Sequence, residues 1–257
     1  MIDTHCHLDD EQYQDDLDLV IQRAKEAGIT KIFVPGICNK DILHLINICN
    51  KHKGFLYPMV GLHPENIMDE DFHSALESME KHIDDSTIAI GEVGLDLYWD
   101  DTHESEQIEV LEQQIQWAIK YDLPLMFHVR KAHNQILKIM RSHKNDNLKG
   151  VFHCFSGSRE QARELLQFPD FMLGIGGILT FKKSKLPEVL REEVPINRIV
   201  LETDGPYMAP TPYRGKRNES AYVVEVAKML ADIYGLPLED IDRITTENAM
   251  KIFKKSF

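Results

Sequence analysis

The sequence predicts an α/β protein built as a (β/α)8 TIM barrel. Short apolar segments rich in β-branched and aromatic residues alternate with helical patterns along the chain. Strands that are apolar throughout are typical of parallel sheets with helices on the outer face. The length of 257 residues suits one such barrel. No internal repeat, low-complexity tract or flexible linker divides the chain, so residues 1–257 are expected to form a single domain.

The alternation can be followed element by element. Gly28 is a natural C-terminal cap for the first helix, Asn39 an N-cap for the second, and Ser158 with Gln161 a capping box for the sixth. Strands are expected at residues 2–7, 31–36, 56–62, 88–93, 125–129, 150–155, 171–175 and 198–204. Helices are expected at residues 15–27, 39–52, 71–83 and 105–121, around 136–140, from 158 onward, and at 221–234 and 238–253.

A doubly wound open sheet is the alternative arrangement of the same elements. That fold usually carries a glycine-rich phosphate-binding loop directly after its first strand. At that position this chain has His-Cys-His-Leu-Asp, beginning at His5. The barrel is therefore favoured.

The composition is that of an ordinary globular protein, with 43% hydrophobic and 28% charged residues. No apolar run approaches the length needed to span a bilayer, and the N-terminus lacks a signal-peptide pattern. The cysteines form no Cys-x-x-Cys pair, which indicates a reducing, cytoplasmic setting. The formal net charge of −13 argues against binding nucleic acid by bulk electrostatics. A local basic patch or bound cations would still permit such binding.

The candidate functional site starts with His5 and His7 on the first strand. Side chains alternate across a strand, so both imidazoles project to one side while Cys6 faces the other side and packs in the core. The same alternation turns Cys154 away from His153. Two imidazoles spaced in this way on a rigid strand can bind one metal ion. A histidine pair with a purely structural role is the alternative.

Further imidazole and carboxylate groups fall at the C-terminal ends of other predicted strands, where the active sites of such barrels lie. The complete set is His5, His7, His63, Glu92, His128, His153 and Asp204. Buried polar groups need partners, so packing alone does not explain this concentration at one end of a barrel. Imidazole and carboxylate suit Zn²⁺, or Mn²⁺ or Mg²⁺ with more water. The set exceeds what one catalytic ion needs, so two ions about 3.5–4 Å apart are expected, with Glu92 as their bridge.

Other charged groups near the same end each have two interpretations. Glu202 is either an auxiliary group of the metal site or a carboxylate of the barrel interior. Arg130 either binds an anionic substrate or pairs with a carboxylate. Two basic segments could either bind phosphate or form a charge cluster exposed to solvent. These contain Arg214, Lys216 and Arg217, and Lys182, Lys183 and Lys185.

Most remaining histidines lie in helical stretches and are expected to be ordinary surface residues away from the site. They are His44, His52, His73, His82 and His143. The sequence leaves the role of His133 open.

These residues lie in segments that resemble the TatD-type metal-dependent deoxyribonucleases, part of the wider amidohydrolase-like barrels. The segments read D-T-H-C-H-L, V-G-L-H-P, I-G-E-V-G-L-D, F-H-V-R, F-H-C-F-S-G, L-E-T-D-G-P-Y and R-G-K-R-N-E, in chain order from residue 3 to residue 219. They span nearly the whole chain, which makes the match specific. Three positions depart from the family pattern: Ser220 replaces a frequent Pro, Gly205 a frequent Ala or Ser, and Lys131 a frequent acidic residue. Lys131 bears on substrate contacts near Arg130, and none of the three is a ligand in the family.

The resemblance implies a role for each group in the set. One divalent ion (Zn²⁺, Mg²⁺ or Mn²⁺) would be bound by His5, His7, Glu92 and Asp204. The second would be bound by Glu92, His128 and His153. His63 would contact the substrate phosphate. Barrels of the wider group that carry a carboxylated lysine on strand four differ, because Glu92 occupies that place.

The reaction implied is hydrolysis of phosphodiester bonds in DNA by a water activated between two metals, as a 3′-to-5′ exonuclease acting on single strands or 3′ ends. Asp204 could orient or deprotonate the water, and His63 and Arg130 would neutralise charge developing on phosphorus. Arg214, Lys216 and Arg217 favour this nuclease interpretation. Metal-dependent hydrolysis of a small amide, lactone or cyclic imide is the alternative, which the acidic net charge favours. A metal-binding scaffold without turnover is a third class.

Overall fold

Parallel strands alternate with helices in a TIM barrel, as the sequence predicts. The computed structural model describes residues 1–253. Its eight-stranded sheet has the order β1 to β8, and each strand pairs in parallel with the next along the chain. The strands are β1 Ile2–Asp3, β2 Lys31–Val34, β3 Leu56–Val60, β4 Ala89–Asp96, β5 Leu125–Arg130, β6 Gly150–Phe152, β7 Phe171–Ile175 and β8 Ile199–Leu201.

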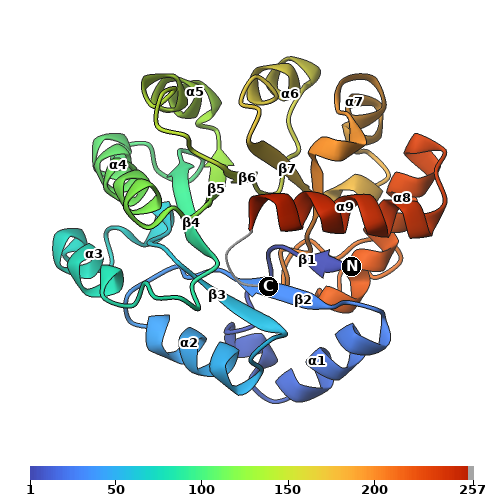
Figure 1. The fold of residues 1–257 in the computed structure, drawn as a ribbon, viewed down its shortest axis with the longest axis horizontal. Helices are drawn as coiled ribbons and strands as arrows, with labels where there is room; N and C mark the ends of the chain where they lie inside the picture. Colours follow the sequence, from blue (N-terminus) through green and yellow to red (C-terminus); the bar gives the residue numbers. More distant parts are fainter. Residues whose placement is uncertain (254–257) are drawn as a thin grey trace.

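Helices surround this sheet. They are α1 Leu17–Glu26, α2 Ile42–Lys51, α3 Phe72–Glu80, α4 Glu104–Tyr121, α5 His133–Ser142, α6 Arg159–Leu165, α7 Leu186–Glu193, α8 Val223–Tyr234 and α9 Leu238–Ile252. Figure 1 shows α1 to α8 arranged around the strands and α9 passing across them. None of the helices within residues 1–253 is long and apolar enough to cross a membrane.

The first and last strands lie side by side and complete the barrel. The Thr4 amide donates to the Leu201 carbonyl at 3.0 Å, and Cys6 forms a parallel bridge with Gly205. The Asp204 amide also donates to the His5 carbonyl at 2.9 Å. These contacts bring the segment after β1 beside the segment after β8, at the end of the barrel that carries the candidate site.

The local signals that end and begin the helices are mostly confirmed. Gly28 adopts the left-handed φ of 84° expected after α1, and Ser158 and Gln161 form the capping box that opens α6. The prediction for Asn39 is wrong, because α2 begins after Asp41. Residues 39–41 form a turn, so Asn39 lies too far before the first helical residue to cap it, and its side chain donates to Glu70 at 3.2 Å.

Several strands differ in length from the prediction. β6 and β8 stop early because the chain turns into a left-handed conformation just beyond them, at Cys154 (φ 49°) and Asp204 (φ 57°), and such residues cannot continue a ladder. β4 is longer than predicted, since it stays paired with β5 as far as Asp96 opposite Arg130. The observed ends of β4, β6 and β8 therefore determine the direction in which the polar side chains at these ends face.

The barrel interior is apolar at the N-terminal ends of the strands. There one inward residue from each strand packs with the C-terminal part of α9. Phe253 contacts Phe33 with ring centroids 4.7 Å apart, and Ala249 and Ile252 join the same cluster. This packing closes one end of the barrel, so only the C-terminal ends of the strands open to solvent.

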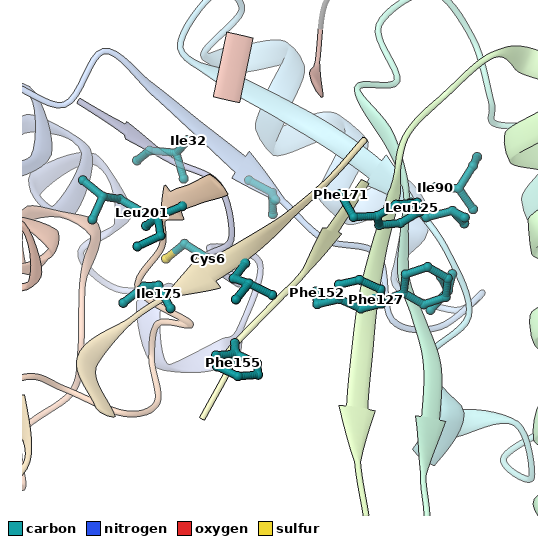
Figure 2. Packing of buried hydrophobic residues seen from close by; sticks show 14 of the residues in the cluster. Cys6, Ile32, Ile90, Leu125, Phe127, Phe152, Phe155, Phe171, Ile175 and Leu201 are labelled. Atoms are coloured by element: carbon teal, nitrogen blue, oxygen red, sulfur yellow. The ribbon is translucent and has the colours of Figure 1, made fainter. Parts of the chain in front are cut away.

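A second and larger cluster fills the space between the strands and the outer helices. Figure 2 shows part of it, including Phe127, Phe152 and Phe171, whose rings stack on one another. Cys6 lies in this cluster and is fully buried, as predicted, although β1 ends at Asp3 and is shorter than the predicted strand. Apolar packing therefore supports the rigid frame on which the polar strand ends are held.

Candidate metal centre

Glu92 lies at the centre of the candidate site, and its two carboxylate oxygens face different groups of histidines. Oε2 lies 3.2 Å from Nε2 of His5 and 3.4 Å from Nε2 of His7. Oε1 lies 2.8 Å from Nδ1 of His128 and 2.8 Å from Nε2 of His153. A carboxylate with one oxygen toward each group has the arrangement of a ligand shared by two sites.

The first group consists of His5, His7 and Asp204. The two Nε2 atoms are 3.2 Å apart, and Asp204 Oδ1 lies 3.8 Å from the first and 3.6 Å from the second. Two nitrogens each about 2.1 Å from one ion in tetrahedral geometry would lie about 3.4 Å apart. The spacing of this group therefore fits a single metal ion.

The second group consists of His128 and His153 with the other oxygen of Glu92. Nδ1 of His128 and Nε2 of His153 are 3.3 Å apart, which again fits ligands of one ion. His63 approaches the same oxygen, with its Nε2 3.4 Å away. The Nδ1 atom of His63 accepts the Glu65 amide at 3.2 Å, so Nε2 carries the proton. His63 thus presents an N–H donor to the site.

The charges at the site differ from group to group. Burial lowers the pKa of His128 and His153, but the carboxylates beside them outweigh it and raise both pKa values, so a metal ion would displace a proton from these two rings. Burial raises the pKa of Glu92, but His153, His63 and His5 outweigh it and hold that pKa well below its usual value. Burial lowers the pKa of His5, and it lowers the pKa of His63 to about 4. Glu92 is therefore an anion, and His5 is a neutral imidazole with a lone pair that can bind a cation.

The strand ends are shaped to bring these groups together. Ile90 on β4 pairs with Leu125 on β5, and the next pair joins Val93 to Phe127. β4 therefore has one extra residue between these pairs, which forms a bulge that includes Glu92. Such bulges redirect a side chain. On β7, a side chain at Gly174 would collide with the carboxylate of Glu202, so glycine leaves space for that buried acid.

Glu202 lies behind His153, on the side away from Glu92. Its Oε1 accepts the Cys154 amide at 2.6 Å and lies 3.6 Å from Nδ1 of His153. Of the two interpretations open for this acid, the geometry favours an auxiliary one, in which Glu202 holds the chain beyond β6 and places negative charge beside His153 without a hydrogen bond to its ring. It does not belong to the groups with metal-ligand spacing.

Asp96 is a functional candidate that sequence reasoning did not assign. Its Oδ2 lies 2.9 Å from Nε2 of His128, so that imidazole donates there and turns its Nδ1 lone pair toward Glu92. Burial raises the pKa of Asp96, but its bond with His128 and other donors outweigh this and lower that pKa to about 2. The signal available was its place as the last residue of the I-G-E-V-G-L-D segment, four residues beyond Glu92.

A cavity of 1230 Å³ opens over the site and leads outward between the strand-end loops. Glu92, His63, His128, His153 and Asp204 all line it. Arg130 lines it as well, with 42% of its side chain exposed. The mouth also carries acidic groups, namely Asp9, Asp10, Glu11, Asp41 and Glu65.

The predicted basic loop after β8 does not line this cavity. Arg217 donates to both carboxylate oxygens of Asp16 at 2.7 Å and lies over the Tyr13 ring. Arg214 lies over the Phe181 ring at 3.7 Å, and Lys216 is exposed. A role for these residues in substrate binding stays a prediction.

Among the helical histidines, the prediction for His44 is wrong in one respect. His44 is exposed, but it lines the cavity because α2 flanks the opening. His143 lies between Glu112 and Asp146, 2.7 Å from each, and His133 lies 2.8 Å from Glu164. These last two are ion-pairing residues of the outer helices.

The resemblance seen in the sequence is confirmed by comparison with known proteins. The profile of the TatD related DNase family matches residues 2–254. The chain belongs to this family. Relatives over nearly the whole chain include the uncharacterized metal-dependent hydrolase YabD of Bacillus subtilis, 38% identical over 99% of both chains. The uncharacterized metal-dependent hydrolase YcfH of Escherichia coli K12 is 30% identical over 98% of this chain and 95% of its own.

Solved structures of TatD-family proteins have the same barrel. YjjV, the TatD homolog from Escherichia coli K12, superposes with a TM-score of 0.92 at 30% identity, over 99% of this chain and 98% of its own. The TatD-family hydrolase from Entamoeba histolytica superposes with a TM-score of 0.85 at 26% identity, over 98% and 97%. The relatives are metal-dependent hydrolases, and the groups around Glu92 offer the ligands that such a reaction requires.

In this TatD-family barrel, two glutamines of α4 hold the backbone of neighbouring strand ends. The Gln114 side chain accepts the Leu62 amide at 2.7 Å and donates to the Leu62 carbonyl at 3.1 Å. Gln107 makes the equivalent pair of bonds with Asp96, both at 2.9 Å. Leu62 precedes His63, so Gln114 fixes the turn that presents this histidine.

Replacing Gln114 by alanine is expected to destabilise the protein by about 2–3 kcal/mol, because the buried Leu62 amide and carbonyl lose their partners. Activity should fall as well, because His63 would no longer be held. Urea unfolding and a rate measurement test this. The exposed Gln116 on the same helix provides the control variant, Gln116→Ala. Equal stability of the two variants would show that the Leu62 bonds contribute nothing.

Proposed function

We propose that this TatD-family protein hydrolyses phosphodiester bonds in DNA with two divalent ions, as a 3′-to-5′ exonuclease. The observation that carries the proposal is the position of Glu92, whose Oε2 faces His5 and His7 while its Oε1 faces His128 and His153. Two adjoining ion sites occur in phosphatases, polymerases and nucleases, and also in aminopeptidases. Family membership supports the choice of DNA as substrate.

His5, His7, Glu92 and Asp204 would hold one ion, and Glu92, His128 and His153 the other. When bound, such ions activate water near neutral pH and neutralise charge on phosphoryl oxygens. Neutral imidazoles and ionised carboxylates suit Zn²⁺, Mn²⁺ or Mg²⁺. Asp96 would orient the ring of His128 toward the ions, and Glu202 would place negative charge beside His153.

The remaining groups of the site have distinct roles. Burial raises the pKa of Asp204, but its bond with His7 and the charges of the other histidines outweigh it, so the net shift is downward. Asp204 is therefore ionised and faces the cavity, where it can accept a proton from the attacking water. The Nε2–H of His63 would donate to a non-bridging phosphate oxygen, and Arg130 would neutralise charge on the same phosphate.

The test offers the metal-stripped protein a 5′-labelled oligonucleotide with Mg²⁺, Mn²⁺ or Zn²⁺ restored separately. We expect stepwise shortening from the 3′ end with added ion and none in chelator. Substrates blocked at the 3′ end should resist. Full activity in chelator, or shortening that starts at the 5′ end, would contradict the proposal.

Hydrolysis of a small amide, lactone or cyclic imide is the competing function. The acidic groups at the mouth favour it, because Asp9, Asp10, Glu11, Asp41 and Glu65 repel a polyanion. The same protein and ions are therefore offered a panel of amides, lactones and imides. Turnover of that panel without shortening of the oligonucleotide would replace the nuclease assignment.

Neutralising Arg214 and Lys216 is expected to weaken binding of a single-stranded oligonucleotide and flatten its salt dependence, by about 0.7 in slope for each phosphate that the loop neutralises. Arg217→Gln is made separately, because its ion pair with Asp16 also affects stability. Binding is measured by fluorescence anisotropy across a salt series. Lys81→Gln on α3 serves as the control, since Lys81 is 68% exposed. An unchanged slope would make this loop a solvated surface.

A further inference from the structure

Two large aromatic side chains lie exposed directly beyond β4. Tyr98 is 50% exposed and Trp99 is 70% exposed, whereas Trp117 on α4 is 1% exposed. The two exposed rings form an edge-to-face pair with centroids 4.8 Å apart. Leaving this much aromatic surface in water forgoes the stabilisation that burial would give. Such a surface is typical of a place where another flat group binds.

Arg130 completes this surface. Its guanidinium carbon lies 4.0 Å from the centroid of the Tyr98 ring and 5.1 Å from that of Trp99. The same guanidinium lies 3.8 Å from Oδ2 of Asp96, which in turn contacts His128 of the candidate metal centre. A cation and two aromatic faces therefore adjoin the reaction site. We call Tyr98, Trp99 and Arg130 the aromatic platform.

The platform belongs to the rim of the reaction cavity. Trp99 lines the 1230 Å³ cavity together with Glu92 and His128. It also lines a neighbouring hollow of 480 Å³, with Pro64 and Met68. Trp99 thus forms a ridge between the two spaces. A chain whose phosphate lies at the metal centre would pass over this ridge on leaving the cavity.

We propose that the aromatic platform stacks the nucleobase next to the phosphate being cleaved, and so positions the unpaired end of the substrate. The inference rests on the proposed function and names the side chains that would hold the substrate beside the metal centre. A ring can stack on Trp99 only after it has left the double helix, and Arg130 can bind the adjoining phosphate. Base–aromatic stacking tolerates every base, because each has a π-face. Preference should thus follow strandedness rather than sequence.

A nucleobase fits this surface better than a protein side chain does. The platform pairs flat apolar faces with a cation, which matches a base joined to a phosphate. It is continuous with the cavity that holds the candidate ligands, so one substrate would contact both. A protein partner covering Trp99 would block the mouth of the site.

The test combines a protein variant with a modified substrate. Trp99→Ala should raise KM for a single-stranded oligonucleotide roughly ten-fold or more. Trp99→Phe should restore most of the loss. An oligonucleotide with an abasic nucleotide nearest its 3′ end lacks the base that would stack. Its KM with the wild type should rise about as much as the Trp99→Ala change raises KM, and its KM with Trp99→Ala should rise little further. Leu19→Ala on α1, where Leu19 is 55% exposed, is the control and should match the wild type.

Fluorescence provides an independent readout. The chain has two tryptophans, so quenching by an oligonucleotide in chelator reports on Trp99, because Trp117 is buried. One outcome would overturn this inference alone. The wild type would shorten DNA, its fluorescence would not be quenched by the oligonucleotide, and Trp99→Ala would match it on the intact and the abasic substrates. If the wild type neither shortens DNA nor is quenched by it, the proposed function fails as well.

Discussion

Replacing Glu92 by alanine is expected to lower the rate of DNA hydrolysis by about 10³-fold or more, the scale on which removing an essential group acts. Both oxygens of Glu92 face histidine groups, so its loss removes a ligand from two sites at once. Metal content should therefore fall together with turnover. Inductively coupled plasma mass spectrometry beside a rate measurement checks both.

The barrel itself should survive the Glu92→Ala change. Its stability comes from the apolar cluster closed by Phe253 and from the larger cluster under the helices, and neither includes Glu92. The circular dichroism spectrum of the variant should match that of the wild type. Glu202→Ala, which removes a buried acid outside the ligand groups, is the comparison. If Glu92→Ala bound two ions with near-normal turnover, Glu92 would not be the bridge.

Replacing Asp204 by asparagine should have a different effect. Asparagine keeps the shape and one ligand oxygen, but it cannot accept a proton from water. Asp204 Oδ1 lies 3.6 Å or more from the imidazoles, at the edge of its group, so most of the metal should remain. Turnover should fall by about 10²–10⁴-fold, the usual contribution of a general base.

The separation of metal content from rate is what distinguishes these two variants. Both quantities are measured on the same preparation of Asp204→Asn, after reconstitution with a single type of ion. A variant that loses its metal would make Asp204 chiefly a ligand. A variant that keeps both metal and rate would leave the proton to another group, and His63 would be tested next.

The fold and the central histidines were predictable because their signals are local. A strand of apolar residues ending in His128 or His153 indicates both the element and its polar exit. The place of Glu92 between the two histidine groups was also predictable from strand order, because strand four lies between the strand-one and strand-eight group and the strand-five and strand-six group. These features follow from the alternation of apolar strands with helices along the chain and from the order of strands in a barrel.

Other features depend on contacts that no local pattern contains. Arg217 pairs with Asp16 across 201 positions of the chain, so its partner was not visible in the sequence. The predicted cap at Asn39 is wrong because a turn at residues 39–41 delays the start of the helix to Ile42. The role of Asp96 depends on which nitrogen of His128 faces inward, and that is a matter of three-dimensional geometry.

The central claim is that hydrolysis of DNA requires both ion sites that share Glu92. The most direct test is a titration of the metal-stripped protein with Mn²⁺, in which bound ion and the rate of shortening of a 3′-ended oligonucleotide are measured at each step. The account predicts that the rate stays near zero while the first ion binds and rises as the second ion binds. A full rate at one bound ion, or with none, would contradict it.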